Sequence, residues 1–251
     1  PAFFSHKDEK ASAGYYSVLL KEEGIKAELT ATTHAGVHRY TFPSGKEAAL
    51  VIDLAHLLDN EYIYEATLER TADNEIAGMH RTRGWTDNQY VYFVAQFSKP
   101  FQTIDFIQNK KMVSAGVKLN GTDLQACLSF DNSNGEPVIA KVGLSIVSEK
   151  NARENLETEV IGFDFDAVRS AARSAWEQAL SAITVKGGNT DDLKNFYTAM
   201  YHSMVVPNVV SDINGEYRRH NMEIGQLPKG KVQYSTFSLW DTFRAWNPLM
   251  T

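Results

Sequence analysis

Two segments of this sequence concentrate the residue types that recognise sugars. Planar aromatic rings stack on the apolar face of a sugar ring, and carboxylates or amides form hydrogen bonds with its hydroxyls. The first segment, residues 84–89, places Trp85 beside acidic and amide side chains. The second segment, residues 234–251, contains the adjacent pair Trp240 and Asp241. Both segments therefore have the composition of a carbohydrate contact.

The second segment also has the pattern of a helix start. Ser238 can serve as the N-cap, which places Trp240 and Asp241 in the first turn. The helix dipole favours an ionised Asp241 there, able to accept hydrogen bonds from sugar hydroxyls, and Arg244 is spaced to pair with it. The alternative is that Asp241 is only a helix-start charge and Trp240 only a core residue. Spacing alone does not separate these two interpretations.

The first segment lies in a loop just before residues 90–97, the run with the strongest β pattern. Loops carry binding residues more often than cores do, so Trp85 is a second candidate contact. A tryptophan at the start of a strand can equally cover the end of a β-sandwich, and the sequence leaves both interpretations open.

Other motifs that carry chemistry are missing from the sequence. His34 and His38 are four residues apart, but they flank Gly36 in a β region, which excludes the helical spacing of a zinc site. No nucleophile elbow, P-loop or dinucleotide-binding glycine motif occurs. The single cysteine, Cys127, precludes an intrachain disulfide. We assign no catalytic residue and no metal ligand within the chain.

The first part of the chain has the pattern of β structure. Short alternating or apolar runs, separated by Gly, Asn, Asp and Ser turns, continue to about residue 147. Residues 90–97 are apolar on both faces, which is typical of an inner strand covered on each side. Several short strands at near-even spacing predict an antiparallel sandwich or barrel, and the pattern changes near residues 150–165.

Helical periodicity follows. With Asp166 as N-cap, apolar residues recur at helical spacing until the glycines at 187–188. A second amphipathic helix is capped by Asn189 or Thr190 and ends before Pro207. Two such helices in succession predict a helix-on-helix layer after the β domain.

Composition narrows the class of protein. The chain has 43% hydrophobic and 22% charged residues, as in soluble globular proteins, and no apolar run reaches the roughly 18–20 residues of a membrane span. The net charge of −6 argues against a nucleic-acid partner, which needs a clustered basic surface. The chain opens at Pro1 without Met and stops at Thr251 without a helix C-cap. We expect both ends to be cuts in a longer protein; the alternative is a processed mature protein.

Four stretches of the sequence resemble glycoside hydrolase family 92. Residues 4–20 match its F-S-H…E-x-A-x-x-G-Y-Y-x-V pattern, and residues 27–42 match A-E-L-T-A-T…G-x-H-R-Y-x-F. Residues 84–93 match G-W…Q-Y-V-Y-F, and residues 234–244, which read Y-S-T-F-S-L-W-D-T-F-R, resemble the start of the catalytic helical domain. The motifs occur in order along the whole chain.

The resemblance implies an α+β multidomain architecture, an antiparallel β-sandwich followed by the first helices of an (α/α)6 barrel. We place the sandwich at 1–158, and the linker helix with the start of the catalytic domain at 159–251. Members of the family that this sequence resembles are calcium-dependent, inverting exo-α-mannosidases, mostly from bacteria. Their active site lies between the two domains.

For this chain the resemblance implies a secreted or periplasmic bacterial enzyme that releases terminal α-linked mannose from glycans. It implies Trp240 and Asp241 as substrate-binding residues in the mannose pocket, with Trp85 as a further contact. Family members are about three times longer, so the catalytic carboxylates, the Ca²⁺ ligands and the rest of the catalytic domain are expected outside 1–251. The alternatives are a non-catalytic carbohydrate-binding sandwich, or a related glycosidase with another sugar specificity.

Overall fold

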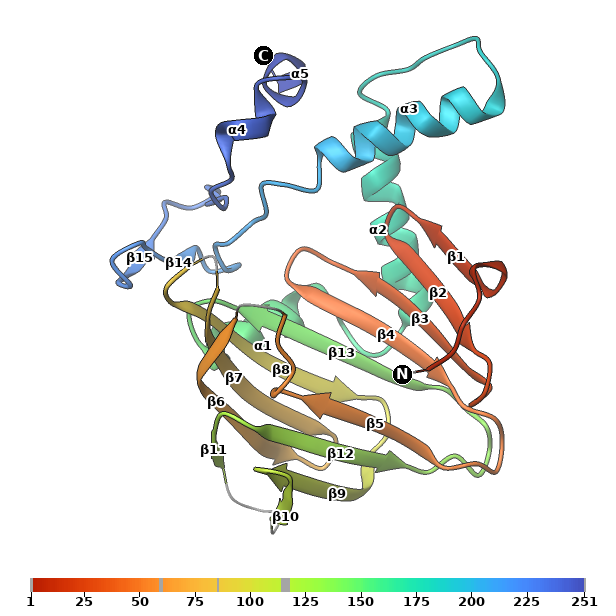
Figure 1. Cartoon of the computed structure of the whole chain (residues 1–251), viewed down its shortest axis with the longest axis vertical. Coiled ribbons are helices and arrows are strands. Elements are labelled where there is room, and N and C mark those ends of the chain that lie inside the picture. Colours follow the sequence, from red (N-terminus) through yellow and green to blue (C-terminus); the bar gives the residue numbers. More distant parts are fainter. Residues whose placement is uncertain (1, 59–60, 85, 114–117, 251) are drawn as a thin grey trace.

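The protein is described by a computed structural model that covers residues 2–58, 61–84, 86–113 and 118–250. A β-sandwich forms its lower part, and helices and a long linker extend from one end of the sandwich (Figure 1). The sandwich followed by helices confirms the fold class predicted from the sequence.

The larger sheet is antiparallel with the strand order β1-β2-β3-β4-β13-β8-β7-β6-β11. Its strands are β1 (Glu9–Ser12), β2 (Tyr15–Leu20), β3 (Ile25–Ala31), β4 (Ala35–Thr41), β6 (Tyr62–Ala72), β7 (Glu75–Arg83), β8 (Gln89–Phe97), β11 (Leu119–Gly121) and β13 (Val138–Ser145). A short 3₁₀ turn, His6–Asp8, precedes β1.

The smaller sheet has the order β10-β9-β12-β5 and is also antiparallel. It contains β5 (Ala48–Asp53), β9 (Phe101–Gln108), β10 (Lys111–Val113) and β12 (Leu124–Phe130). The main core lies between the two sheets, and its fully buried side chains include Leu68, Ile76, Phe106, Leu128 and Phe130.

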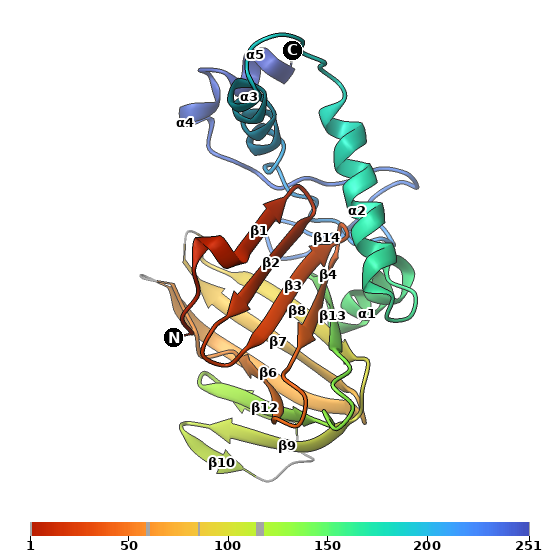
Figure 2. The same cartoon turned by 90° about the vertical axis from the view of Figure 1, so that its right-hand side faces the viewer.

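A second core lies on the other face of the larger sheet, where α1 (Glu149–Glu159) and the start of α2 (Phe165–Leu180) cover it (Figure 2). Leu156 and Phe165 pack there against Val37 and Val94. Because Val94 faces this second core while Phe93 and Phe97 face the first, β8 is apolar on both faces, as predicted.

α1 was not predicted, since most of its residues are polar. It packs closely on β13: a Cβ on Gly143 would lie 2.3 Å from the carbonyl oxygen of Ala152. The start of α2 also differs from the prediction. Its N-cap is Asp164, which accepts a hydrogen bond from the Ala167 amide, whereas the carboxylate of Asp166 binds the Arg39 guanidinium at 2.8 Å.

The remaining elements form the helical part and the segment between α3 and α4, residues 204–238, which we call the linker. α3 (Thr190–Ser203) begins with the predicted Asn189 N-cap, which forms a capping box with Asp192. A two-stranded hairpin follows, β14 (Glu216–Arg218) and β15 (Ile224–Gln226). The predicted third helix is split into α4 (Leu239–Thr242) and α5 (Trp246–Met250). No helix in the described ranges is both long and apolar enough to cross a membrane.

Candidate functional site

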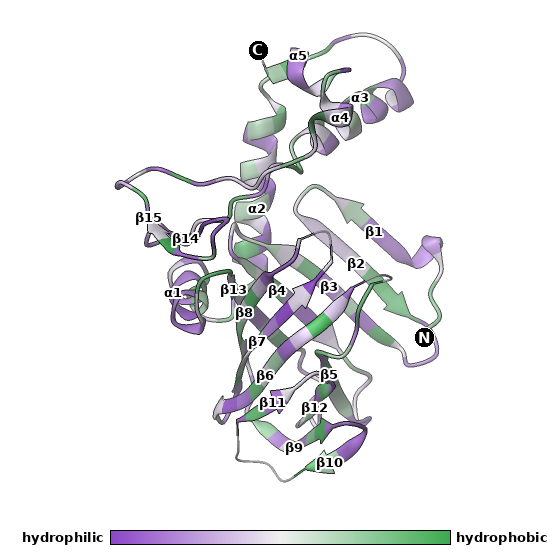
Figure 3. Cartoon of the chain, turned by 60° about the vertical axis from the view of Figure 1, so that its left-hand side comes forward, coloured by the Kyte–Doolittle hydropathy of each residue, from purple (hydrophilic) through white to green (hydrophobic). Residues whose placement is uncertain are grey.

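The Trp240–Asp241 pair lies at the start of α4, as predicted. The Ser238 hydroxyl accepts a hydrogen bond from the Trp240 amide at 3.2 Å, and Asp241 lies in the first turn. Trp240 is 81% exposed, so it belongs to no core in the described part of the chain. Leu239 of α4 and Leu249 and Met250 of α5 are likewise exposed. Figure 3 shows the hydropathy of the residues along the ribbon of the chain.

Asp241 and Arg244 are spaced to pair, but in the described part of the chain they form no ion pair. The Arg244 guanidinium lies 5.6 Å from the centre of the Phe243 ring instead. α4 ends at Thr242, with Phe243 as its C-cap, so Arg244 is not carried on a continuing helical face that would bring it to Asp241. The Asp241 carboxylate is therefore exposed and has no salt bridge to Arg244.

Contacts on both sides hold the segment around α4. On its N-terminal side, Tyr234 forms an isolated β-bridge with Val209, and the Ser235 amide donates to the carbonyl oxygen of Asn208 at 2.7 Å. We call residues 208–211 and 233–235 together the entry ribbon. On the C-terminal side, the Trp246 indole donates to the carbonyl oxygen of Ser203, at the end of α3, at 2.7 Å. Five residues, 236–240, lie between the entry ribbon and Asp241.

The predicted contact Trp85 lies outside the described residues. The loop around it is fixed by Arg81, which donates to the side-chain oxygen of Asn88 from Nε at 3.1 Å and from Nη2 at 2.7 Å. The same guanidinium lies 5.1 Å from the rings of Tyr64 and Tyr90. These contacts hold Asn88 and the start of β8 in place, and the role of Trp85 stays a prediction.

A buried polar cluster joins the sandwich, α1 and the linker, and no sequence pattern predicted it. The carboxylate of Asp212, only 5% exposed, accepts hydrogen bonds from Ser145 and Asn151 at 2.7 Å and from Asn155 at 2.8 Å. The side-chain oxygen of Asn155 accepts from the Ile213 amide in return. These contacts fix the linker at the point where it leaves the sandwich.

The same junction contains an ion pair between His34 and Glu159. His34 Nδ1 lies 2.6 Å from Glu159 Oε1, and the other carboxylate oxygen accepts from the His34 amide at 2.8 Å and the Thr32 hydroxyl at 2.5 Å. Burial opposes the charged form, but the bonds to Glu159 and to the carbonyl oxygen of Ser211 raise the pKa of His34 above its ordinary value. Burial likewise opposes ionisation of Glu159, but the donors around it lower the pKa of that carboxyl.

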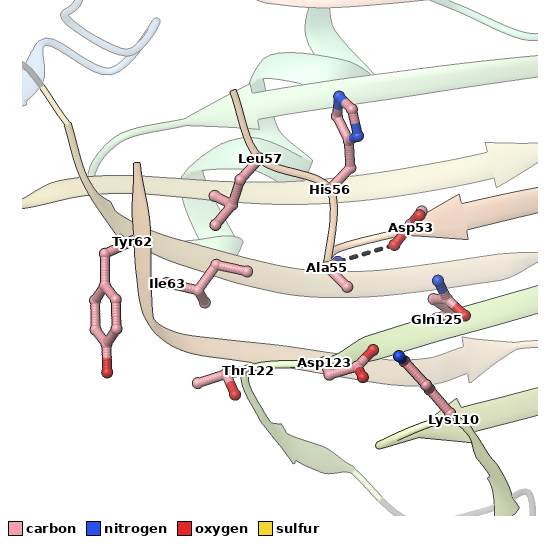
Figure 4. A pocket seen from close by; sticks show the side chains of 10 residues that line it. All are labelled: Asp53, Ala55, His56, Leu57, Tyr62, Ile63, Lys110, Thr122, Asp123 and Gln125. Carbon is pink, nitrogen blue, oxygen red and sulfur yellow. Dashed lines mark hydrogen bonds between the residues drawn. The ribbon is translucent and has the colours of Figure 1, made fainter. Parts of the chain in front are cut away.

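Two of the hollows in the described part of the chain bear on the argument, and both lie away from α4. One, of about 720 Å³, opens at the edge of the sandwich between the loop after β5, the start of β6 and the start of β12 (Figure 4). One of its carboxylates, Asp53, accepts a hydrogen bond from the Ala55 amide at 2.9 Å, so it serves a local turn. The other hollow, of about 830 Å³, follows the alanine-rich face of α2 beside the β3–β4 turn.

Among the residues that the structure describes, we identify no pair of carboxylates suited to catalysis. Glu216 accepts a hydrogen bond from Asn151 at 2.7 Å and belongs to the polar cluster, while Glu223 is exposed on the β14–β15 hairpin. In the described ranges no three His, Cys, Asp or Glu side chains converge on a possible metal position.

Comparisons with known proteins agree along the whole chain. Residues 2–145 match the glycosyl hydrolase family 92 N-terminal domain, and residues 151–251 match the family 92 catalytic domain. The two matches leave 146–150 between them, and the predicted boundary at residue 158 stays a prediction.

Three relatives illustrate the similarity. A family 92 α-mannosidase from Bacteroides thetaiotaomicron superposes with a TM-score of 0.93 and 34% identity over 99% of this chain and 34% of its own. A family 92 inverting mannosidase from the same species gives a TM-score of 0.87 and 25% identity over 99% of this chain and 33% of its own. An uncharacterized secreted glycosidase from Arthroderma benhamiae is 30% identical over 95% of this chain and 33% of its own length. The chain thus spans about a third of the length of these relatives.

Proposed function

This chain belongs to glycoside hydrolase family 92, and we propose that it forms the N-terminal part of an inverting exo-α-mannosidase that releases terminal α-linked mannose from glycans. The observation that carries the proposal is the match over 99% of the chain, including the α4 segment, to a solved α-mannosidase with a TM-score of 0.93. Inversion is supported by the inverting mannosidase among the similar structures.

We propose that Trp240 and Asp241 bind the terminal mannose. The exposed Trp240 ring offers an apolar face for stacking on the sugar. The exposed carboxylate of Asp241 can accept hydrogen bonds from sugar hydroxyls, which are stronger for an ionised acceptor. Trp85, in the loop held by Arg81, would add a contact from the sandwich.

The reaction itself needs two carboxyl groups about 6.5–9.5 Å apart. One protonates the departing glycosidic oxygen, and the other removes a proton from the water that attacks the anomeric carbon from the opposite face. We propose that residues outside this chain, in the rest of the catalytic domain, supply both. The exposed apolar face of α2 beside the larger hollow supports this, because further helices would cover it.

Calcium belongs to the proposal for the complete enzyme only. The residues described here do not form a three-ligand cluster, so we derive no step through the ion and expect its ligands elsewhere. Secretion, to the periplasm or beyond the cell, is proposed from the relative described as a secreted glycosidase.

The test is hydrolysis of α-1,2-mannobiose by the complete enzyme, with and without a chelator, with the anomeric form of the first product followed by NMR. We expect β-mannose and loss of activity with the chelator. α-Mannose would contradict inversion, and equal activity with the chelator would contradict the calcium requirement. Absence of hydrolysis with and without the chelator would contradict the mannosidase assignment.

The role of Asp241 is tested with a matched pair of variants. Asp241→Asn removes the charge of the acceptor, and we expect kcat/KM to fall about 100-fold, since hydrogen bonds to charged groups contribute about 1.5–3 kcal/mol each. Asp191→Asn removes an exposed first-turn charge from α3 and should change kcat/KM less than about twofold. Equal effects of both variants would assign Asp241 to helix capping alone.

A further inference from the structure

The His34 ring lies between two groups that can only accept hydrogen bonds. Its Nδ1 is 2.6 Å from a carboxylate oxygen of Glu159, and its Nε2 is 2.8 Å from the carbonyl oxygen of Ser211. Both ring nitrogens must therefore donate, which requires the imidazolium form. The His34 and Glu159 side chains are only 12% and 14% exposed, so the ion pair is largely withdrawn from water.

This ion pair connects three elements that are far apart in the sequence. His34 lies in the turn between β3 and β4, and its own carbonyl oxygen accepts from the Leu144 amide at the end of β13. Glu159 is the last residue of α1. Ser211 belongs to the entry ribbon that leads to α4. The pair thus joins the sandwich, α1 and the segment that carries Trp240 and Asp241.

Ser211 and its neighbour Val210 connect the His34 contact to the other side of the entry ribbon. Its hydroxyl accepts a hydrogen bond from the Gln233 amide at 3.0 Å, and the neighbouring Val210 amide donates to the Gln233 carbonyl oxygen at 2.9 Å. The two sides of the ribbon are therefore fixed to each other. Holding Ser211 on the sandwich also holds the strand that enters α4.

Two carboxylates act electrostatically on His34, Glu159 from α1 and Asp212 from the linker, and both favour its charge. From its own turn, Thr32 contributes a hydroxyl that does not titrate. The buried Asp212 is held by the neutral donors Ser145, Asn151 and Asn155. At this junction, gain or loss of the proton on His34 is therefore the event that changes the charge near neutral pH.

We propose that the protonated His34–Glu159 pair is a positioning device for substrate binding, which holds the entry ribbon on the sandwich and thereby fixes the place of the α4 segment that carries Trp240 and Asp241. His34 and Glu159 are positioning residues and touch no substrate. The proposal rests on the proposed function, because it assigns the α4 segment to the sugar.

Loss of the proton sets the direction of the effect. The pKa of His34 is raised above 6.5, because the bonds to Glu159 and Ser211 outweigh the opposing effect of burial. The restraint is therefore fully present below pH 6.5 and is lost as the pH rises through the raised value. A neutral imidazole can donate from one nitrogen only, so either Glu159 or Ser211 loses its partner.

Three variants separate this device from a general loss of stability. His34→Gln removes the charge. His34→Arg keeps a cation with donors for both acceptors but cannot titrate in this range. His6→Gln is the matched control, because His6 forms a similar pair with Glu9 at 2.5 Å but is 90% exposed and lies before β1.

The first measurement is amide hydrogen exchange of the entry ribbon in the complete protein between about pH 6 and about pH 9, corrected for intrinsic exchange. In the wild type we expect protection at Val210 and Gln233 to fall about tenfold as the pH rises, since a charge-assisted bond is lost. His34→Arg should keep the higher, low-pH protection throughout, and His34→Gln should show the lower, high-pH protection throughout. A pH-dependent loss in His34→Arg equal to that of the wild type, or wild-type protection in His34→Gln, would overturn the proposal.

The second measurement is mannoside hydrolysis. His34→Gln should raise KM about tenfold while kcat changes less than twofold, and His34→Arg and His6→Gln should keep the wild-type KM. A fall in kcat at unchanged KM would refute the positioning role. The exchange experiment needs no activity, so a failure of the mannosidase assignment leaves it intact and the two failures can be told apart.

Discussion

Replacing Glu75 by Gln should loosen the attachment of α1 to the sandwich. Glu75, at the start of β7, is 5% exposed. Its carboxylate accepts two hydrogen bonds from the Arg153 guanidinium of α1, at 2.6 and 2.7 Å, one from Gln96 at 2.8 Å and one from the Thr71 hydroxyl. The variant keeps the shape of the side chain but loses the charge and one of the two acceptor oxygens that face Arg153.

The magnitude follows from the acidity of this carboxyl. Burial opposes ionisation, but Arg153, Thr71 and Gln96 lower the pKa of Glu75 from 4.5 to about 2. A gap of that size corresponds to at most about 3.4 kcal/mol. Because the Arg153 side chain is 33% exposed, solvent screens part of this, and we expect about 2 kcal/mol. A lowered pKa means that the stabilisation is present above pH 4.5 and is lost as the pH falls toward 2.

The assay is urea unfolding followed by far-UV circular dichroism at a series of pH values. At pH 7 the Glu75→Gln variant should be about 2 kcal/mol less stable than the wild type, and the difference should shrink between about pH 5 and about pH 3. Glu157→Gln is the control, because Glu157 is 57% exposed and 3.9 Å from the same guanidinium; it should cost less than about 0.5 kcal/mol. A difference independent of pH, or an equal loss in the control, would refute the electrostatic argument.

Three further substitutions probe the helices that follow the sandwich, and the same unfolding assay checks each. Gly143→Ala should cost about 3 kcal/mol, because its Cβ would lie 2.3 Å from the Ala152 carbonyl oxygen and force α1 away from β13. Gly162→Ala should cost only about 1 kcal/mol, because its φ of +65° is strained for alanine but nothing lies within 4 Å; an equal loss in both would contradict the close-packing argument. Asn189→Ala removes the capping box of α3 and should cost about 1 kcal/mol, and an unchanged helix signal with unchanged stability would contradict it.

The sandwich was predictable because its pattern is local. Ile25–Ala31 alternates between apolar and polar residues and forms β3, as the alternation predicts, although its two buried residues are Glu28 and Thr30 rather than residues of the apolar face. Residues 90–97 are apolar on both faces because β8 separates two cores. Neither observation depends on residues far away in the chain, so period-two reasoning identified both strands.

α1 was not predictable in the same way, because polar side chains occupy much of its buried face. Asn151 and Asn155 are 2% and 0% exposed and point to Asp212, about sixty residues further along the chain. Helical periodicity counts apolar residues, so a buried asparagine is not counted. The ion pair of His34 with Glu159 could not be predicted either. Its partners are 125 positions apart in the sequence, and neither residue type indicates burial on its own.

The α4 segment shows what sequence spacing leaves open and what the structure adds. Leu239 and Phe243 are four residues apart, so they lie on one face of the helical turn, and they are 70% and 62% exposed. Asp241 is two residues from each, and at about 100° per residue it points to roughly the opposite side. An isolated turn of this length is not stable in water by itself, so Leu239 and Phe243 need an apolar partner surface. That partner can cover them without covering Asp241, and this is why packing of α4 into a helical domain and sugar binding by its carboxylate are compatible roles for one turn.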